Sequence, residues 1–367
     1  MKLVIFGLTI SSSWGNGHAT LWRGLCRNLT SMGWSVVFFE RDAPYYASAR
    51  DFTRMPAGSH LQIYADWDEI APVARAHLRD ADAAIVTSYC PDGIAATEML
   101  CDSPCPRAIF YDLDTPVTLA ELAAGREIAA IGPRGLSDFD LVLSFSGGPA
   151  LGILHARLGA RRVAPLYGHV DPDVHRPMQR EPRFHADLCY LGTYAADRQR
   201  ALERLFVEPA RHRPDLRFVI AGAQYPQDFP WTRNIYFMRH LPPGDHASFF
   251  SSARLTLNVT RAAMAEMGWC PSGRLFEAAA CGVAILTDDW PGLTHFFTPG
   301  EDILVADEVG GAVAALDATD VELARLGENA RERILSNHTS ARRARELEAL
   351  IASIDASRDA PASAMEA

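Results

Sequence analysis

Residues 270–289 read CPSGRLFEAAACGVAILTDD, a polar turn followed by an alanine-rich segment, a glycine and an apolar segment. Pro271 is typical of a helix start and Gly282 of a helix C-terminus, so the pattern predicts a short helix and then a buried strand. The N–H groups at a helix N-terminus attract anions. The residues there that are candidates to hold a phosphate are Ser272, Gly273 and Arg274.

Glu277 lies about one helical turn after Arg274. Its carboxylate is placed to accept hydrogen bonds from sugar hydroxyls. The alternative is an exposed ion pair between Arg274 and Glu277 on an ordinary surface helix, worth only ~0.2–0.5 kcal/mol. This helix by itself fits both interpretations about equally.

Length and composition restrict the class of protein. The chain has 367 residues and is 48% hydrophobic, which favours two domains, each with its own core. The net charge of −10 and the pI near 5.6 argue against a nucleic-acid partner or an anionic membrane surface. Any phosphate site must therefore be local.

The seven cysteines are scattered, so they indicate neither a disulfide framework nor a zinc site, and we expect reduced thiols and no metal site. The first ten residues lack a signal-peptide pattern, and no apolar run reaches the ~18 residues of a membrane span. We therefore expect a cytoplasmic protein without a transmembrane segment.

The first half alternates apolar runs with helical patterns, which predicts a parallel, doubly wound α/β sheet. The expected strands are 2–9, 34–40, 61–65, 83–87, 107–111, 141–145 and 163–167. The loop after the first strand contains Gly15, Asn16 and Gly17, which allow a ligand to approach the backbone closely, and His18 begins the next helix. His18 is a candidate general base, although a histidine at a helix start is more often simply solvated.

Polar residues follow the later strands of this half, where ligands bind on such sheets. Tyr89 follows one strand, and Asp112 and Asp114 follow the next. Either aspartate is a candidate to act as a base or to hold an acceptor hydroxyl. The alternative is that one of them caps the helix that begins near Pro116.

The second half repeats the α/β pattern, with strands expected at 188–191, 217–221, 234–238 and 254–260. Its strand ends supply further candidates for donor contacts: Gly192, Thr193, Gly222, His240, Leu241 and Asn258. Arg198 is expected on a long helix and Arg261 after a strand. Together with Arg274 they are candidates to converge on a diphosphate.

These patterns divide the chain into a domain at 1–168, a linker at 169–180, a second domain at 181–337, a C-terminal helix at 338–355 that packs back on the first domain, and a tail at 356–367.

Over both of its halves, the sequence resembles the GT-B glycosyltransferases. The segment GHVDPDVHRP at 168–177 resembles their interdomain segment, and FEAAACGVAILTD at 276–288 resembles their donor-site helix, in which the family's Glu binds ribose. More narrowly, NVTR at 258–261, PSGRLFE at 271–277 and WPGL at 290–293 resemble the CgeB-like, spore-maturation-type members.

The resemblance implies two Rossmann-like domains that face each other across a cleft. It also implies a hexosyltransferase-type enzyme that takes a UDP- or dTDP-sugar as co-substrate, without a cofactor or metal ion, and a small-molecule, glycan or protein acceptor. It places Glu277 on a ribose and His18 on the acceptor side. On this interpretation Gly15, Asn16 and Gly17 join the donor contacts, Tyr89 and Asp112 lie on the acceptor side, and Asp114 is catalytic together with His18. An epimerase of the same fold and a non-catalytic sugar-nucleotide-binding protein are the alternatives.

The stereochemistry of transfer stays open. Retaining members carry a Glu-x7-Glu motif, whereas the residue eight positions before Glu277 is Trp269. The segment from Gly15 to His18 resembles the Gly-rich loop and histidine of some inverting members.

Overall fold

The computed structural model describes residues 1–358, without the side chains of residues 357 and 358. It divides into two compact units: unit 1 is Met1–Tyr167 with the C-terminal segment from Ser340, and unit 2 is Gly168–Thr339. The predicted linker, residues 169–180, lies within unit 2, and the predicted tail lies mostly outside the described residues.

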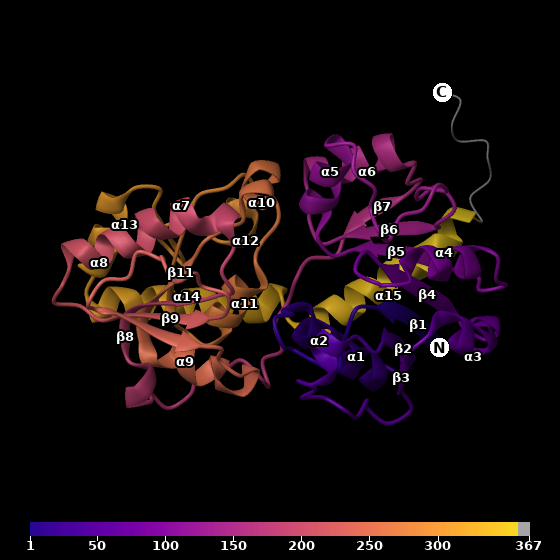
Figure 1. Cartoon of the computed structure of the whole chain (residues 1–367), viewed down its shortest axis with the longest axis horizontal. Coiled ribbons are helices and arrows are strands. Elements are labelled where there is room, and N and C mark those ends of the chain that lie inside the picture. Colours follow the sequence, from indigo (N-terminus) through magenta and orange to yellow (C-terminus); the bar gives the residue numbers. More distant parts are fainter. Residues whose placement is uncertain (359–367) are drawn as a thin grey trace. The chain divides into compact units, whose positions relative to one another are not determined.

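Unit 1 contains a seven-stranded parallel sheet in the order β3-β2-β1-β4-β5-β6-β7 (Figure 1). The strands are β1 Lys2–Gly7, β2 Ser35–Arg41, β3 His60–Tyr64, β4 Ala83–Thr87, β5 Ala108–Asp112, β6 Leu141–Ser144 and β7 Val163–Pro165. β1, β4 and β5 consist mostly of apolar residues and are buried along almost their whole length, as expected for the central strands of a parallel sheet.

Helices cover both faces of this sheet (Figure 1). They are α1 His18–Ser31, α2 Pro44–Ala47, α3 Trp67–Arg79, α4 Gly93–Cys101, α5 Thr115–Ala123, α6 Pro149–Leu158 and α15 Ser340–Arg358. The last of these packs against α1, and the indole of Trp34 donates to Glu348 Oε1 over 2.9 Å.

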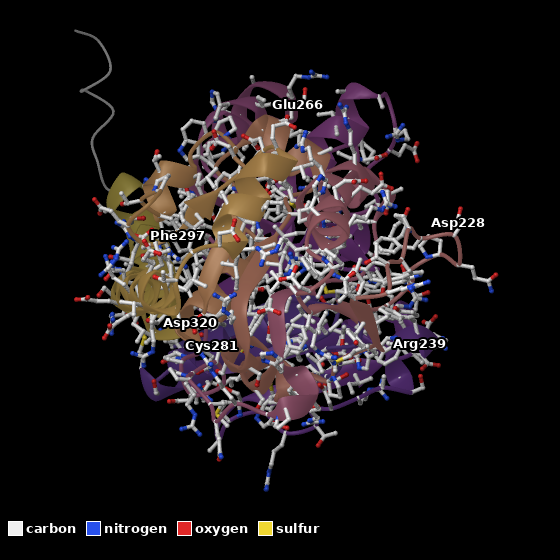
Figure 2. The ribbon with its side chains drawn as sticks, turned by 90° about the vertical axis from the view of Figure 1, so that its left-hand side faces the viewer. Asp228, Arg239, Glu266, Cys281, Phe297 and Asp320 are labelled. Carbon is white, nitrogen blue, oxygen red and sulfur yellow. The ribbon has the colours of Figure 1, made fainter. Side chains whose placement is uncertain are left out.

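Unit 2 contains a six-stranded parallel sheet in the order β10-β9-β8-β11-β12-β13. The strands are β8 Ala186–Leu191, β9 Phe218–Gly222, β10 Ile235–Arg239, β11 Ala253–Asn258, β12 Ala284–Thr287 and β13 Leu304–Val305. Figure 2 looks onto this unit and shows Asp228, from the segment between β9 and β10, standing out from the unit's body.

The helices of unit 2 are α7 Gln199–Leu202, α8 Glu208–His212, α9 His246–Ser252, α10 Ala262–Met267, α11 Gly273–Ala280, α12 Leu293–Phe296, α13 Val309–Leu316 and α14 Asp320–Asn337. A π-helical turn, η3 Glu203–Val207, joins α7 to α8, and single 3₁₀ turns are η1 Pro182–Phe184, η2 Ala196–Arg198 and η4 Pro243–Asp245. The long α14 begins with a capping box between Thr319 and Glu322.

Three predictions about elements can be compared with the structure. The first strand ends at Gly7 rather than at residue 9, because Glu40 binds the N–H groups of the following residues Ile10 and Ser11. Arg198 does not lie on the long helix but closes the 3₁₀ turn before it. Among the described residues, no helix is both long and apolar enough to cross a membrane.

Candidate functional site

In unit 1, a buried carboxylate shapes the loop that leads to His18. Glu40, the sixth residue of β2, is 1% exposed, and its Oε2 accepts hydrogen bonds from the N–H groups of Ile10 at 2.8 Å and Ser11 at 2.9 Å. Asn16 continues the arrangement, since its side chain donates to Thr9 O and accepts from His18 N–H. The loop is thus fixed at both ends.

His18, Tyr89 and Asp114 form one cluster at the ends of their elements. The rings of His18 and Tyr89 are 5.6 Å apart, and the Tyr89 hydroxyl donates to Asp114 Oδ2 over 2.7 Å. Burial lowers the pKa of His18, and the Asp114 carboxylate opposes this shift. A neutral imidazole beside a carboxylate is suited to accept a proton from a hydroxyl group.

Asp112, the last residue of β5, has different surroundings. Its side chain is fully buried, and Oδ1 accepts from Asp114 N–H at 3.1 Å and from the Thr118 hydroxyl at 3.0 Å. Burial raises the pKa of Asp112 to about 6. Asp112 therefore organises the turn into α5, and Asp114 carries the interaction with Tyr89.

In unit 2, the predicted donor residues stand at the carboxyl ends of neighbouring parallel strands. Gly192 follows β8 and Gly222 ends β9, and the two backbones come so close that a Cβ on Gly222 would lie 2.0 Å from Gly192 O. A Cβ on Gly192 would lie 2.8 Å from Arg274 Nη2. Glycine at 222 therefore permits the close approach of the two backbones, and glycine at 192 leaves room for the Arg274 side chain.

Arg274 extends from the first turn of α11 across these strand ends. Its Nη1 donates to Asn258 Oδ1 over 3.3 Å, and its guanidinium lies 4.9 Å from the centre of the Tyr190 ring. Burial lowers the pKa of Arg274, and the positive charge of Arg198 acts in the same direction. This half-buried residue is not the exposed surface arginine of the alternative interpretation.

Arg198 and Arg274 lie close enough to repel each other electrostatically, and within residues 1–358 neither forms an ion pair. The Nε of Arg198 is buried without a hydrogen-bond partner in the described part of the chain, and its Nη1 donates weakly to Thr193 O at 3.4 Å. Arg261 instead pairs with Asp197 over 3.1 Å. The structure therefore brings two of the three predicted arginines together and ties the third to the residue before Arg198.

The remaining donor candidates belong to both units. Ser272 is the N-cap of α11, and its side chain makes no capping hydrogen bond, while Gly273 opens the helix. His240 has a left-handed φ of 57° and donates its N–H to Gly222 O, and Leu241 O lies 3.2 Å from His246 Nε2. Gly15 and Gly17 are exposed and belong to unit 1.

Several residues of the site have no clear sequence signal. Tyr225 donates to Gly192 O, and the Asp288 carboxylate accepts from the N–H and hydroxyl of Thr260, which fixes the segment before Arg261. His175 and His246 lie beside Glu277, with 3.9 Å between His175 Nε2 and Glu277 Oε1. A polar residue directly after a strand, such as Asp288, is the one signal that could have pointed to part of this set.

Comparison with known proteins bears on both units. Residues 198–349 match a family model described as "Glycosyl transferase-like", which includes α11 and the donor candidates from Arg198 to Glu277. None of the curated proteins compared with the chain matches it.

Solved structures resemble the chain over nearly its whole length. A sucrose-phosphate synthase from Thermosynechococcus elongatus has a TM-score of 0.72 at 14% identity and covers 97% of this chain and 100% of its own. Anabaena HepE with UDP-glucose has 0.68 at 9% identity, over 96% and 100%. An alpha-glucosyltransferase in complex with UDP and DNA has 0.68 at 14%, over 96% and 99%. The fold is therefore that of the GT-B glycosyltransferases.

Proposed function

We propose that the chain is a glycosyltransferase that transfers a sugar from a nucleoside-diphosphate sugar to an acceptor hydroxyl. The donor groups belong to unit 2, around Arg198, Arg274 and Glu277. The acceptor-side groups belong to unit 1, where His18 takes the acceptor proton and Asp114 supports it.

The observation that carries the proposal is the pair of neighbouring guanidinium groups of Arg198 and Arg274, which have no carboxylate partner among the described residues. Cations withdrawn from water without a counterion are unfavourable. A diphosphate would offset both charges and accept hydrogen bonds from the unpartnered Nε of Arg198 and from the N-terminus of α11. The match of residues 198–349 to a glycosyltransferase-like family supports the same interpretation.

The finer features are part of the proposal. The leaving diphosphate is stabilised by the two arginines and the helix N-terminus rather than by a metal ion, so transfer is metal-independent. The donor is a UDP- or dTDP-hexose, in keeping with the UDP and UDP-glucose bound by the similar structures. The CgeB-like resemblance of residues 258–261 and 271–277 supports the further proposal that the enzyme belongs to that group. The net charge of −10 favours an acceptor other than nucleic acid.

The test begins with a thermal-shift screen of UDP, dTDP, GDP and their sugars, followed by calorimetric titration of the best donor. Arg274→Ala and Glu277→Ala should each weaken binding by ~1.5–3 kcal/mol, the range for hydrogen bonds to charged groups. The matched control is Arg200→Ala, which removes an exposed arginine of the same unit. If all variants bind the donor with the affinity of the wild type, the donor site does not lie at this position.

Turnover separates the three candidate activities. Transfer to an acceptor, unaffected by EDTA, supports the proposal. Release of a changed sugar without an acceptor would indicate an epimerase, and donor binding without any turnover would indicate a binding protein. Loss of activity in EDTA, with recovery on addition of Mg²⁺ or Mn²⁺, would contradict metal independence.

A further inference from the structure

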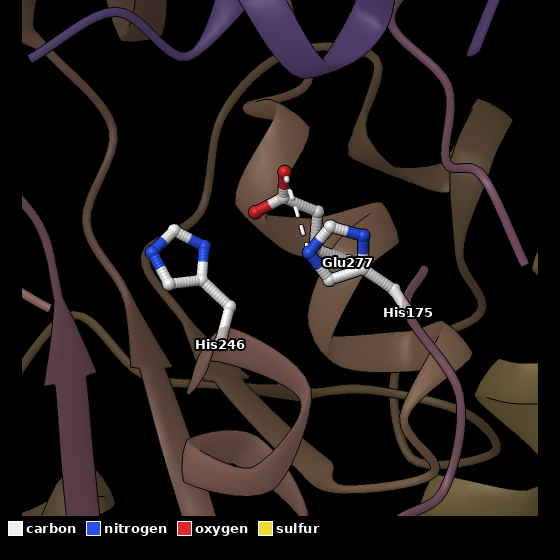
Figure 3. Close-up of side chains that lie close together, drawn as sticks. All are labelled: His175, His246 and Glu277. Atoms are coloured by element: carbon white, nitrogen blue, oxygen red, sulfur yellow. Dashed lines mark ion pairs between the residues drawn. The ribbon is translucent and has the colours of Figure 1, made fainter. Parts of the chain in front are cut away.

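His175, His246 and Glu277 come from three separate segments of unit 2 and meet at one point (Figure 3). His175 lies in the segment before β8, His246 begins α9, and Glu277 lies on α11. One ligand atom from each residue lies within 4.8 Å of the other two, and the two imidazole rings are 6.3 Å apart. The cluster is enclosed within a single unit.

Both histidines point a nitrogen without a hydrogen-bond partner into this cluster. His175 is 3% exposed, and its Nε2 has no hydrogen-bond partner within residues 1–358. The Nδ1 of His246 is also buried without a partner in this part of the chain, while its Nε2 lies 3.2 Å from Leu241 O. Because a carbonyl oxygen can only accept, Nε2 of His246 carries the proton and Nδ1 presents a lone pair to the cluster.

A buried polar atom left without a hydrogen-bond partner is unfavourable, and among the described residues the cluster has two such nitrogens facing one carboxylate. The separation of 3.9 Å between His175 Nε2 and Glu277 Oε1 is too long for a hydrogen bond. The three side chains therefore do not satisfy one another. A ligand that accepts two nitrogen lone pairs and a carboxylate at once would satisfy all of them.

We propose that His175 Nε2, His246 Nδ1 and the Glu277 carboxylate form a binding site for a divalent transition-metal ion of the zinc class. Three atoms within 4.8 Å of one another leave a central point no more than about 2.8 Å from each. Shifts of roughly 0.6–0.8 Å bring them to the 2.0–2.2 Å typical of zinc. Two imidazoles and one carboxylate leave the fourth position of the ion open.

The two imidazole nitrogens and the carboxylate also determine which kind of ion would bind. Imidazole nitrogens suit Zn²⁺, Co²⁺, Ni²⁺ and Cu²⁺, whereas Mg²⁺ and Ca²⁺ prefer sites made of oxygen ligands. The contact between His246 Nε2 and Leu241 O is of the kind that orients metal-binding histidines in known sites. Mg²⁺ is therefore expected to leave this site empty.

Metal binding has a consequence that rests on the proposed function. If Glu277 holds the ribose of the donor, an ion coordinated by Glu277 occupies the same carboxylate, so the ion and the nucleotide compete. Zinc is then an inhibitor of donor binding rather than a cofactor, which agrees with metal-independent transfer.

The direct experiment titrates chelator-treated, full-length protein with Zn²⁺ by calorimetry in the absence of nucleotide. One Zn²⁺ should bind per chain. His175→Ala, His246→Ala and Glu277→Gln should each weaken binding by more than the roughly 10–100-fold that loss of an outer hydrogen-bond partner costs. His212→Ala removes an exposed histidine of α8 and should bind zinc like the wild type. Circular dichroism in EDTA checks that each variant is folded. If a histidine variant does not fold, Glu277→Gln, which preserves the size of the side chain, still tests the site.

Absence of stoichiometric Zn²⁺ binding in the wild type would overturn the proposal, as would binding that persists in the three ligand variants. A second titration, with UDP in EDTA and in Zn²⁺, separates this site from the proposed function. Zn²⁺ binding without UDP binding would contradict the donor assignment alone, and UDP binding without Zn²⁺ binding would contradict the metal site alone. Where both bind, Zn²⁺ should weaken UDP binding in the wild type but not in His175→Ala.

Discussion

Asp112 and Asp114 lie two residues apart, yet their carboxyl groups have different partners. Asp112 Oδ1 accepts hydrogen bonds from the turn that follows β5, while its buried Oδ2 has no partner among the described residues. Asp114 accepts from the Tyr89 hydroxyl. We therefore expect Asp112 to affect mainly stability and Asp114 to affect mainly turnover, and different measurements test the two.

For Asp112, we expect stability to depend on pH. Burial raises its pKa from an ordinary 3.8 to about 6, so folding favours the protonated form. Its contribution to stability is fully present below about pH 4 and is lost as the pH rises through about 6. A rise of the Asp112 pKa from 3.8 to about 6 corresponds to ~3 kcal/mol. Asp112→Asn keeps the acceptor oxygen and removes the charge.

The measurement is urea unfolding of wild type and Asp112→Asn across this pH range. The variant should gain stability relative to the wild type as the pH rises, whereas Asp68→Asn, at an exposed position, should follow the wild-type profile. Parallel wild-type and Asp112→Asn curves would contradict the prediction.

For His18 and Asp114, we expect a loss of turnover without a loss of donor affinity. If His18 takes the acceptor proton, His18→Ala should lower kcat by about 10²–10⁴-fold and leave the donor Kd nearly unchanged. Because burial holds the pKa of His18 below 6.5, the acidic limb of kcat should have its midpoint below that pH. In Asp114→Asn the midpoint should fall further, since Asp114 raises the pKa of His18.

Steady-state rates against pH, together with calorimetric donor affinities, provide this test. Tyr89→Phe is a useful partner variant, because it removes only the hydroxyl that donates to Asp114. Near-normal kcat in both His18→Ala and Asp114→Asn would mean that another group takes the proton.

At the scale of elements, a residue of β2 holds the loop between β1 and α1 through hydrogen bonds. The Glu40 carboxylate accepts hydrogen bonds from two backbone N–H groups and from the Ser11 hydroxyl. In Glu40→Gln one of the two carboxylate oxygens is replaced by an NH₂ group, which can only donate. Hydrogen bonds to charged groups contribute ~1.5–3 kcal/mol each. We expect a loss of stability of about 2–4 kcal/mol and faster hydrogen exchange in residues 9–18.

Glu127→Gln is the matched control, because it makes the same change at an exposed position of unit 1. Hydrogen exchange followed by mass spectrometry reports both the loop and the rest of the unit. Unchanged exchange in residues 9–18 of the Glu40 variant would show that Glu40 does not hold the loop.

The elements that the sequence predicts well are those with a strong local pattern. Buried parallel strands such as β4 and β5 appear as short apolar runs bounded by polar residues, and the predicted ends are within one or two residues of the observed ones. The short helices α2, α10 and α12 and the two-residue β13 were not predicted, because they are too short to show a period.

For the candidate site, the sequence indicates residues that follow strands but not their partners. Arg274 and Gly192 were both predicted, whereas their close approach depends on the spacing of β8 and α11 in space. His175 and His246 were not predicted at all, because each lies in a turn-rich segment where a single histidine has no distinguishing pattern. Tertiary packing decides which groups come into contact, and local patterns in a single sequence do not report on tertiary packing.

At the scale of the whole molecule, the chain returns to its first unit after completing the second. α15 belongs to unit 1, with Leu347 and Ile351 fully buried and Arg107 paired with Asp355. The first unit therefore lacks part of its core until the residues of α15 have been made. The stability of unit 1 therefore depends on contacts between two parts of the chain that are separated in sequence by the whole of unit 2.

We therefore expect Leu347→Ala to destabilise one unit selectively. Removing a buried leucine side chain costs about 2–5 kcal/mol, and α15, which carries Leu347, packs against α1 within unit 1. Hydrogen exchange should become faster in α1 and the strands of unit 1, while peptides from β8 to β12 keep wild-type protection, as does donor affinity. Arg345→Ala, an exposed change on the same helix, should alter neither unit. Equal loss of protection in both units would show that they unfold as one cooperative body, and the independence of the two units inferred from their separate cores would then be wrong.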